Sequence, residues 1–193
     1  MVAPSAYDDE LWRLVPEDPP PPPAQLVEFV RRLSARRALD LGCGDGRLTS
    51  ELRAARVFGA DVSEVALERA RARLPAAELR ALSPGEALPY PDCDFDLVLC
   101  AETLEHVQDV QGLLSEARRV LEPRGRLALT TPAHGRLTGL DVLVRGLERR
   151  FDPFSPHLRF FTAGSLRGAL EQTGFELLSL RRSKGTLLAT ATR

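Results

Sequence analysis

Short apolar runs alternate with amphipathic stretches along most of the chain, beginning near residue 24. The apolar runs predict strands, and stretches with apolar residues three and four positions apart predict helices. The expected strands are 38–41, 57–60, 78–82, 95–100, 126–130, 175–181 and 186–191. The expected helices are 24–34, 48–54, 63–74, 113–121 and 165–172. This alternation predicts an α/β protein with a doubly wound, mostly parallel sheet of seven strands and helices on both faces.

The last two expected strands are joined by only three residues, Ser183, Lys184 and Gly185. A connection this short joins antiparallel neighbours, so we expect the last strand to be antiparallel. In an open α/β sheet, ligands bind beyond the carboxyl ends of the parallel strands. The loops that follow the strands are therefore the first places to look for chemistry.

A glycine-rich turn follows the first expected strand. Residues 40–46 read Asp-Leu-Gly-Cys-Gly-Asp-Gly, so the glycines are spaced G-x-G-x-G, and Arg47 stands where a dinucleotide fingerprint needs its third glycine. The helix expected at 48–54 would begin at this turn, with Asp45 at its start pointing outward. Early glycines let the backbone approach a ligand at the turn itself, which suits a ligand without a pyrophosphate. The spacing argues against a nicotinamide dinucleotide.

An acid ends the second expected strand. Asp61 follows the run 57–60, about 20 residues after Asp40. A carboxylate at this place can accept hydrogen bonds from the hydroxyl groups of a ribose. The alternative is that Asp61, together with Ser63, only caps the helix that follows.

A third stretch, 87–107, contains the fourth expected strand and the sequence Glu-Thr-Leu-Glu-His-Val. The three stretches together, in this order over residues 38–107, resemble class I S-adenosylmethionine-dependent methyltransferases of the small-molecule type. The resemblance implies a Rossmann-like sheet, S-adenosylmethionine as cofactor and S-adenosylhomocysteine as product. It also implies cofactor contacts at Asp40, Gly42, Cys43, Gly44, Gly46, Asp61, Val62, Glu86, Ala87 and Cys100. The chain departs from many relatives in having Ser83, Pro84 and Gly85 where an acid stands near the adenine amine.

Methyl transfer from a sulfonium is an in-line displacement, so positioning of donor and acceptor is the main task of the protein. A general base is needed only if the attacking atom must lose a proton. His106, His134 and His157 are the candidate bases, because each follows a strand or lies in the segment expected on the acceptor side. The alternative for each is a histidine that only hydrogen-bonds to a loop.

Glu102, Glu105 and His106 have the spacing that would place all three side chains on one helical face. The spacing matches a metal-binding pattern of some ubiquinone-type O-methyltransferases, in which a cation would acidify a catechol hydroxyl. Because Leu-Glu-His-Val also stands in many relatives without a metal, we expect none here and regard these residues as weak candidates.

The first 23 residues show no pattern of a regular element, and Pro19 to Pro23 predict a stiff linker. Either Trp12 packs on the flank of the domain, or Tyr7 and Trp12 form an aromatic lid over the cofactor. We expect residues 24–193 to form a single domain. Its insertion at about 132–162, with a helix at 137–147, is the expected place of the acceptor.

Composition sets the remaining expectations. The formal net charge of −1 gives no electrostatic case for nucleic acid or membrane binding. Three cysteines without regular spacing indicate neither a disulfide framework nor a metal site. With no signal pattern and no long apolar run, we expect a cytoplasmic monomer or homodimer that acts on a small molecule.

Two other functions stay open. An arginine excess between Arg145 and Arg182 leaves room for a nucleic-acid or protein methyltransferase. The missing acid near Pro84 leaves room for a non-catalytic regulator that binds S-adenosylmethionine or S-adenosylhomocysteine.

Overall fold

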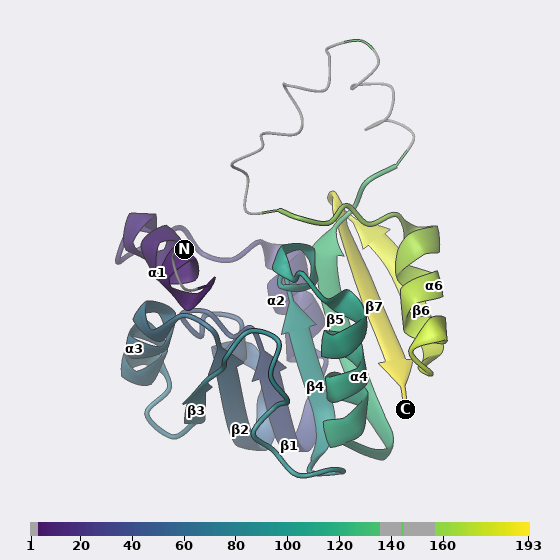
Figure 1. Ribbon diagram of the computed structural model, residues 1–193, viewed down its shortest axis with the longest axis horizontal. Helices are drawn as coiled ribbons and strands as arrows, with labels where there is room; N and C mark the ends of the chain where they lie inside the picture. The colour runs from purple at the N-terminus through teal and green to yellow at the C-terminus, as the bar shows by residue number, and fades with distance from the viewer. Residues whose placement is uncertain (1–3, 136–143, 145–156) are drawn as a thin grey trace.

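A seven-stranded sheet with helices on both faces forms the protein (Figure 1). The computed structural model describes residues 4–135, 144 and 157–193. The strands are β1 (Ser34–Leu41), β2 (Arg53–Asp61), β3 (Glu78–Ala81), β4 (Phe95–Ala101), β5 (Leu121–Pro132), β6 (Glu176–Ser183) and β7 (Thr186–Thr192). The helices are α1 (Pro4–Leu14), α2 (Ala24–Arg31), α3 (Glu64–Arg73), α4 (Val110–Val120) and α6 (Ala163–Gln172), with the 3-10 helices η1 (Thr49–Glu51) and η2 (Leu104–His106).

The strand order is β3-β2-β1-β4-β5-β7-β6. The pairs β1–β2, β1–β4, β2–β3 and β4–β5 are parallel, whereas β7 runs antiparallel to both β5 and β6. The predicted doubly wound sheet with an antiparallel last strand is therefore confirmed. The order reverses between β1 and β4, and in open α/β sheets ligands bind at the carboxyl ends of the strands where the order reverses.

Alternation along β4 divides the core between the two faces of the sheet. Leu97 and Leu99 pack in a cluster with the buried face of α2, whereas Val98 and Cys100 pack in a larger cluster with α4 and α6. All four side chains are fully or almost fully buried, as a continuous apolar run in a central parallel strand requires. The two clusters hold the ends of β1 and β4 rigidly in place.

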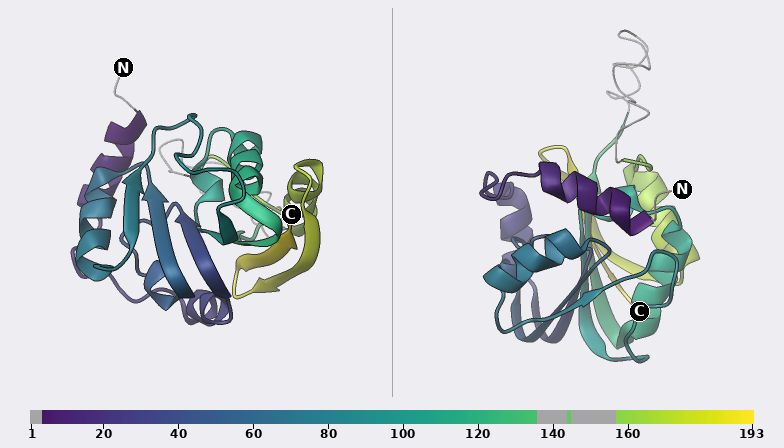
Figure 2. Two further views of the ribbon diagram at one scale, coloured as in Figure 1. Left: turned by 90° about the horizontal axis from the view of Figure 1, so that it is seen from below. Right: turned by 60° about the vertical axis from the view of Figure 1, so that its left-hand side comes forward.

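The prediction of no regular element before residue 23 is wrong, because residues 4–14 form helix α1. This helix lies on α3, toward the edge where the parallel strands end (Figures 1 and 2). An isolated helix of this length is marginal in water, so tertiary contacts must hold it. Residues 15–23, which include the proline run, contain no helix or strand.

The helix predicted at 48–54 is also absent, and its place is taken by the single 3-10 turn η1. The reason is the register of the sheet. β2 pairs with β1 over its whole length, from Ser34 opposite Arg53 to Leu41 opposite Ala60. Arg53 and Ala54, expected at the end of the helix, therefore belong to strand β2. Among the described residues, no α-helix begins at the glycine turn.

The predicted insertion at 132–162 falls mostly outside the described residues, as does the helix expected at 137–147. No helix in the described part of the chain is long and apolar enough to span a membrane.

Candidate functional site

The glycine turn lies where β1 ends, beside β2 and β4. Gly42, Gly44 and Gly46 all have positive φ angles, of 78°, 53° and 79°. The amides of Gly42 and Cys43 both donate to the carbonyl of Ala60, at 2.7 and 3.1 Å, which ties the turn to the end of β2. A Cβ atom on Gly42 would lie 2.3 Å from the Thr103 side chain, so only glycine fits there.

Asp61 braces this turn from the end of β2. One carboxylate oxygen accepts the Gly44 amide at 2.8 Å, and the other accepts the Ser63 amide at 2.9 Å. Burial raises the pKa of Asp61, and the two amides act in the opposite direction. The cap of α3 is Ser63, whose hydroxyl accepts the Ala66 amide. Asp61 therefore joins the loop to the helix start, and its remaining lone pairs are available to a ligand.

Asp40 is buried under the turn at the end of β1. The Thr49 hydroxyl donates to its Oδ2 atom at 2.6 Å, while Oδ1 has no hydrogen-bond partner among the described residues. Burial raises the pKa of Asp40 to about 7, with a smaller contribution from repulsion by Asp61. Asp45, expected to cap a helix and point outward, is instead buried and forms ion pairs with Arg47 and Arg73 at 2.8 and 3.7 Å.

Helix α1 covers the glycine turn. A Cβ atom on Gly44 would lie 2.7 Å from the Trp12 indole, so the indole rests directly on the loop. The guanidinium of Arg69 lies over the Trp12 ring, 5.9 Å from its centroid. Asp9 fixes the helix to α3 by accepting the Ser63 hydroxyl at 2.6 Å and the Val65 amide at 3.2 Å.

Two glutamates follow β4. Glu102 has a φ of 52° and lies before η2, so the prediction that Glu102, Glu105 and His106 share one helical face is wrong. The Thr130 hydroxyl donates to Glu102 at 2.8 Å, and the Thr131 hydroxyl donates to Glu105 at 3.0 Å. Burial raises the pKa of both glutamates to about 7. Repulsion from Glu105 further raises that of Glu102.

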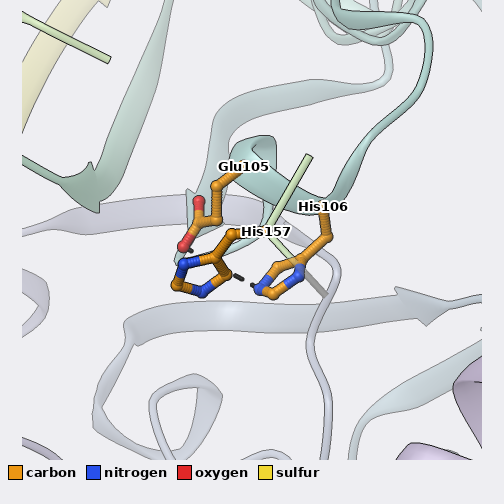
Figure 3. Close-up of side chains that lie close together, drawn as sticks. All are labelled: Glu105, His106 and His157. Carbon is orange, nitrogen blue, oxygen red and sulfur yellow. Dashed lines mark ion pairs between the residues drawn. The ribbon is translucent and has the colours of Figure 1, made fainter. Parts of the chain in front are cut away.

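Glu105, His106 and His157 converge (Figure 3). Glu105 Oε1 lies 3.9 Å from His106 Nε2, and the two imidazole rings are 4.8 Å apart. The backbone carbonyl of Glu105 brings the later segment here, because it accepts the amides of Leu158 and Arg159 at 2.8 and 3.0 Å. One ligand atom from each of the three residues lies within 4.8 Å of the others, a spacing that could hold a cation. Glu102 is not part of this group.

His134 follows β5 on the same edge. Its amide donates to the carbonyl of Phe161 at 2.8 Å, and its ring stands edge-on to Phe160 at 5.0 Å. Burial is the largest cause of the lowered pKa of His157, and repulsion from His106 and from His134 lowers it further. The three predicted bases thus lie near one another beyond the ends of β4 and β5.

The other predicted contacts are distributed around the turn. Cys43 and Cys100 are buried, and burial raises the pKa of both thiols, so neither is a nucleophile. Glu86 and Ala87 are exposed in the turn after β3. Asp9 and Thr103 were not among the residues expected from the sequence. No local signal marked Asp9, because α1 has no acid in its first turn and the partners of Asp9 lie on α3.

Comparison with known proteins identifies a family and several relatives that this chain resembles. Residues 39–129 match the family model described as "Methyltransferase domain". A "Probable S-adenosylmethionine-dependent methyltransferase" of Mycolicibacterium smegmatis is 35% identical over 77% of this chain and 55% of its own length. The 27-O-demethylrifamycin SV methyltransferase of Amycolatopsis mediterranei is 39% identical over 48% of this chain and 37% of its own.

Among solved structures, a SAM-dependent methyltransferase of Mesorhizobium loti has the same fold. The TM-score is 0.66 at 23% identity, over 88% of this chain and 96% of that one. The chain spans 55% and 37% of the length of the two curated relatives above, so it corresponds to part of each of them.

Proposed function

Because the chain belongs to the class I S-adenosylmethionine-dependent methyltransferases, we propose that it transfers a methyl group to a small-molecule acceptor by in-line displacement. Bound S-adenosylmethionine supplies a methyl group already activated by the positive charge of its sulfonium. The protein's residues have to bind this donor, orient the acceptor beside it and exclude water.

The observation that carries the proposal is the glycine turn between two buried acids. Among the described residues, one carboxylate oxygen of Asp40 has no hydrogen-bond partner, and Asp61 has lone pairs beyond its bonds to the Gly44 and Ser63 amides. No helix begins at the turn, so it lacks the dipole that favours a pyrophosphate, and a nucleoside fits better. The residues that would hold the cofactor are Asp40, Gly42, Cys43, Gly44, Gly46, Asp61, Val62, Glu86, Ala87 and Cys100.

Asp61 is the residue to hold the ribose hydroxyls. The turn after β3, with Glu86 and Ala87, is the place for the adenine base. Its exposed backbone groups would have to replace the acid that many relatives have, because Ser83 stands there instead.

The acceptor side is formed by His106, His134 and His157. Because burial and its neighbours lower the pKa of His157, this imidazole is neutral at pH 7 and can accept a proton from an acceptor hydroxyl or amine. A small molecule is supported by the printed activity of the relative from Amycolatopsis mediterranei, which methylates a demethylrifamycin.

Calorimetric titration with S-adenosylmethionine, S-adenosylhomocysteine and NAD tests the cofactor assignment. We expect both sulfur nucleosides to bind and NAD not to bind. In Asp61→Asn, an amide N–H₂ would face the backbone donors of Gly44 or Ser63, so nucleoside affinity should fall about 100-fold. Asp18→Asn, a change at an exposed acid, is the matched control and should bind as the wild type does.

Absence of nucleoside binding to the wild-type protein would refute the proposed function. Binding without any methyl transfer in a broad acceptor screen would favour a non-catalytic regulator, and transfer to RNA or protein substrates would replace the small-molecule acceptor.

A further inference from the structure

One face of α1 is turned toward the glycine turn. Trp12 rests on Gly44, and Asp8 precedes Trp12 by four positions. Residues four apart in a helix lie on the same face, one above the other. Asp8 therefore lies on the face of α1 that covers the site, whereas Glu10 is exposed on the same helix and pairs with Arg13 at 2.9 Å.

The position of this face is fixed by contacts on both sides of Asp8. Asp9, the next residue, accepts the Ser63 hydroxyl and the Val65 amide at the start of α3. Arg69, one turn further along α3, lies over the Trp12 ring and donates to the carbonyl of Pro16 at 3.3 Å. The helix is thus held at its middle and just beyond its end, so Asp8 has little freedom to turn away.

The charged groups that face Asp8 come from three elements. His106 of η2 attracts its carboxylate, and Asp9 of α1 and Asp61 of β2 repel it. Partial burial is the largest cause of the raised pKa of Asp8. Among residues 4–135 and 157–193, no arginine or lysine forms an ion pair with Asp8. Asp8 is therefore a half-buried carboxylate on the face of α1 that covers the glycine turn, within electrostatic reach of the acid assigned to the ribose and of a histidine of the acceptor side.

We propose that Asp8 is a cofactor-binding residue that faces the sulfonium and makes the site prefer S-adenosylmethionine over S-adenosylhomocysteine. The proposal rests on the proposed function. The sulfonium sulfur is bonded to the ribose carbon on one side and carries the transferable methyl group, which must point to the acceptor. A carboxylate within electrostatic reach of the ribose acid and of the acceptor histidine faces that charge. S-adenosylhomocysteine lacks the methyl group and is neutral at sulfur, so the attraction is lost after transfer.

Calorimetric titration of the two nucleosides at pH 8 tests this preference in the wild type, Asp8→Asn and Glu10→Gln. Asparagine keeps the shape of Asp8 and removes its charge. We expect Asp8→Asn to weaken S-adenosylmethionine about tenfold and S-adenosylhomocysteine less than about twofold. Glu10→Gln removes an acid from the exposed side of the same helix and should change neither affinity.

Equal weakening of both nucleosides would mean that Asp8 contacts a group they share, such as the ammonium, and would overturn the proposal. So would unchanged binding of both. Trp12 is the only tryptophan of the chain, so its emission reports whether α1 stays on the turn. Altered emission in Asp8→Asn, with both affinities reduced alike, would assign Asp8 a purely structural role. If the wild type bound neither nucleoside, the proposed function would fail as well.

Discussion

The donor side and the acceptor side of the site are built in different ways. On the donor side, the glycine turn, Asp61 and Ser63 lie within about 20 residues of one another and are joined by hydrogen bonds of 2.7 to 3.1 Å, all donated by backbone amides. On the acceptor side, Glu105 and His157 come from distant segments and meet through one backbone carbonyl and the packing of their side chains. A donor site made of backbone geometry tolerates few changes, while an acceptor site made of side chains can change its shape one residue at a time.

The largest expected effect is a loss of stability caused by a substitution in the glycine turn of the donor side. Gly42→Ala would place a Cβ atom 2.3 Å from Thr103 in a backbone with φ of +78°. We expect the free energy of unfolding to fall by about 3 kcal/mol in chemical denaturation, from strain and overpacking together. Gly85→Ala is the matched control, because Gly85 has a φ of +80° and open space around it.

Gly85→Ala should cost only the left-handed backbone penalty, about 1 kcal/mol. Equal losses in the two variants would show that Thr103 yields, and that the donor side is less rigid than we describe.

The next effect concerns the acceptor side and pH. The pKa of Glu105 is raised to about 7 in the folded protein, from an ordinary value of 4.5. Between these values the folded state binds more protons than the unfolded state, so stability is full at low pH and is lost as pH rises through about 7. Glu105→Gln removes this titration and keeps the backbone carbonyl that holds Leu158.

We therefore expect the free energy of unfolding of Glu105→Gln to fall less between pH 5 and pH 8 than that of the wild type, by about 1–2 kcal/mol. Glu176→Gln, at an exposed position on β6, should follow the wild-type curve. Parallel curves for all three proteins would contradict the burial of Glu105.

The smallest effect separates helix capping from the docking of α1. Ser63→Ala removes the cap of α3 and the partner of Asp9, and Thr162→Ala removes the cap of α6. Each should cost about 1 kcal/mol of stability. Only Ser63→Ala should change the emission of Trp12, because α1 then loses an anchor. Unchanged emission would mean that Trp12 and Arg69 suffice to hold the helix.

Much of the donor side could be predicted because its signals are local. The glycines and Asp61 directly follow strands that the apolar runs marked, and the family read from residues 38–107 is confirmed by the comparisons. The fold followed from the alternation of strands and helices.

The wrong or missing predictions for β2, α1 and His157 have one physical cause. Contacts between residues distant in sequence outweighed the structure that the local sequence pattern indicates. The first half of β2 is polar, with Arg53 and Arg56 on its surface, and sheet pairing alone makes it a strand. Helix α1 depends on Asp9 and Trp12 meeting α3 and the glycine turn, and no local pattern contains those partners. His157 is brought to Glu105 because the amides of the next two residues, Leu158 and Arg159, donate to the Glu105 carbonyl, and no sequence spacing could indicate these bonds.

The strand order also has a consequence for when each strand can pair as the chain folds. β6 reaches the sheet only through β7, which follows it in the chain and pairs with β5 on its other side. The β6–β7 hairpin is local, but its docking pairs Arg126 with Thr192, and such a distant contact closes slowly. Until it docks, β5 has an open edge on which another chain could add a strand. We therefore expect the edge of β5 beside the acceptor side to be covered last, once β7 has been synthesised and has paired with β5.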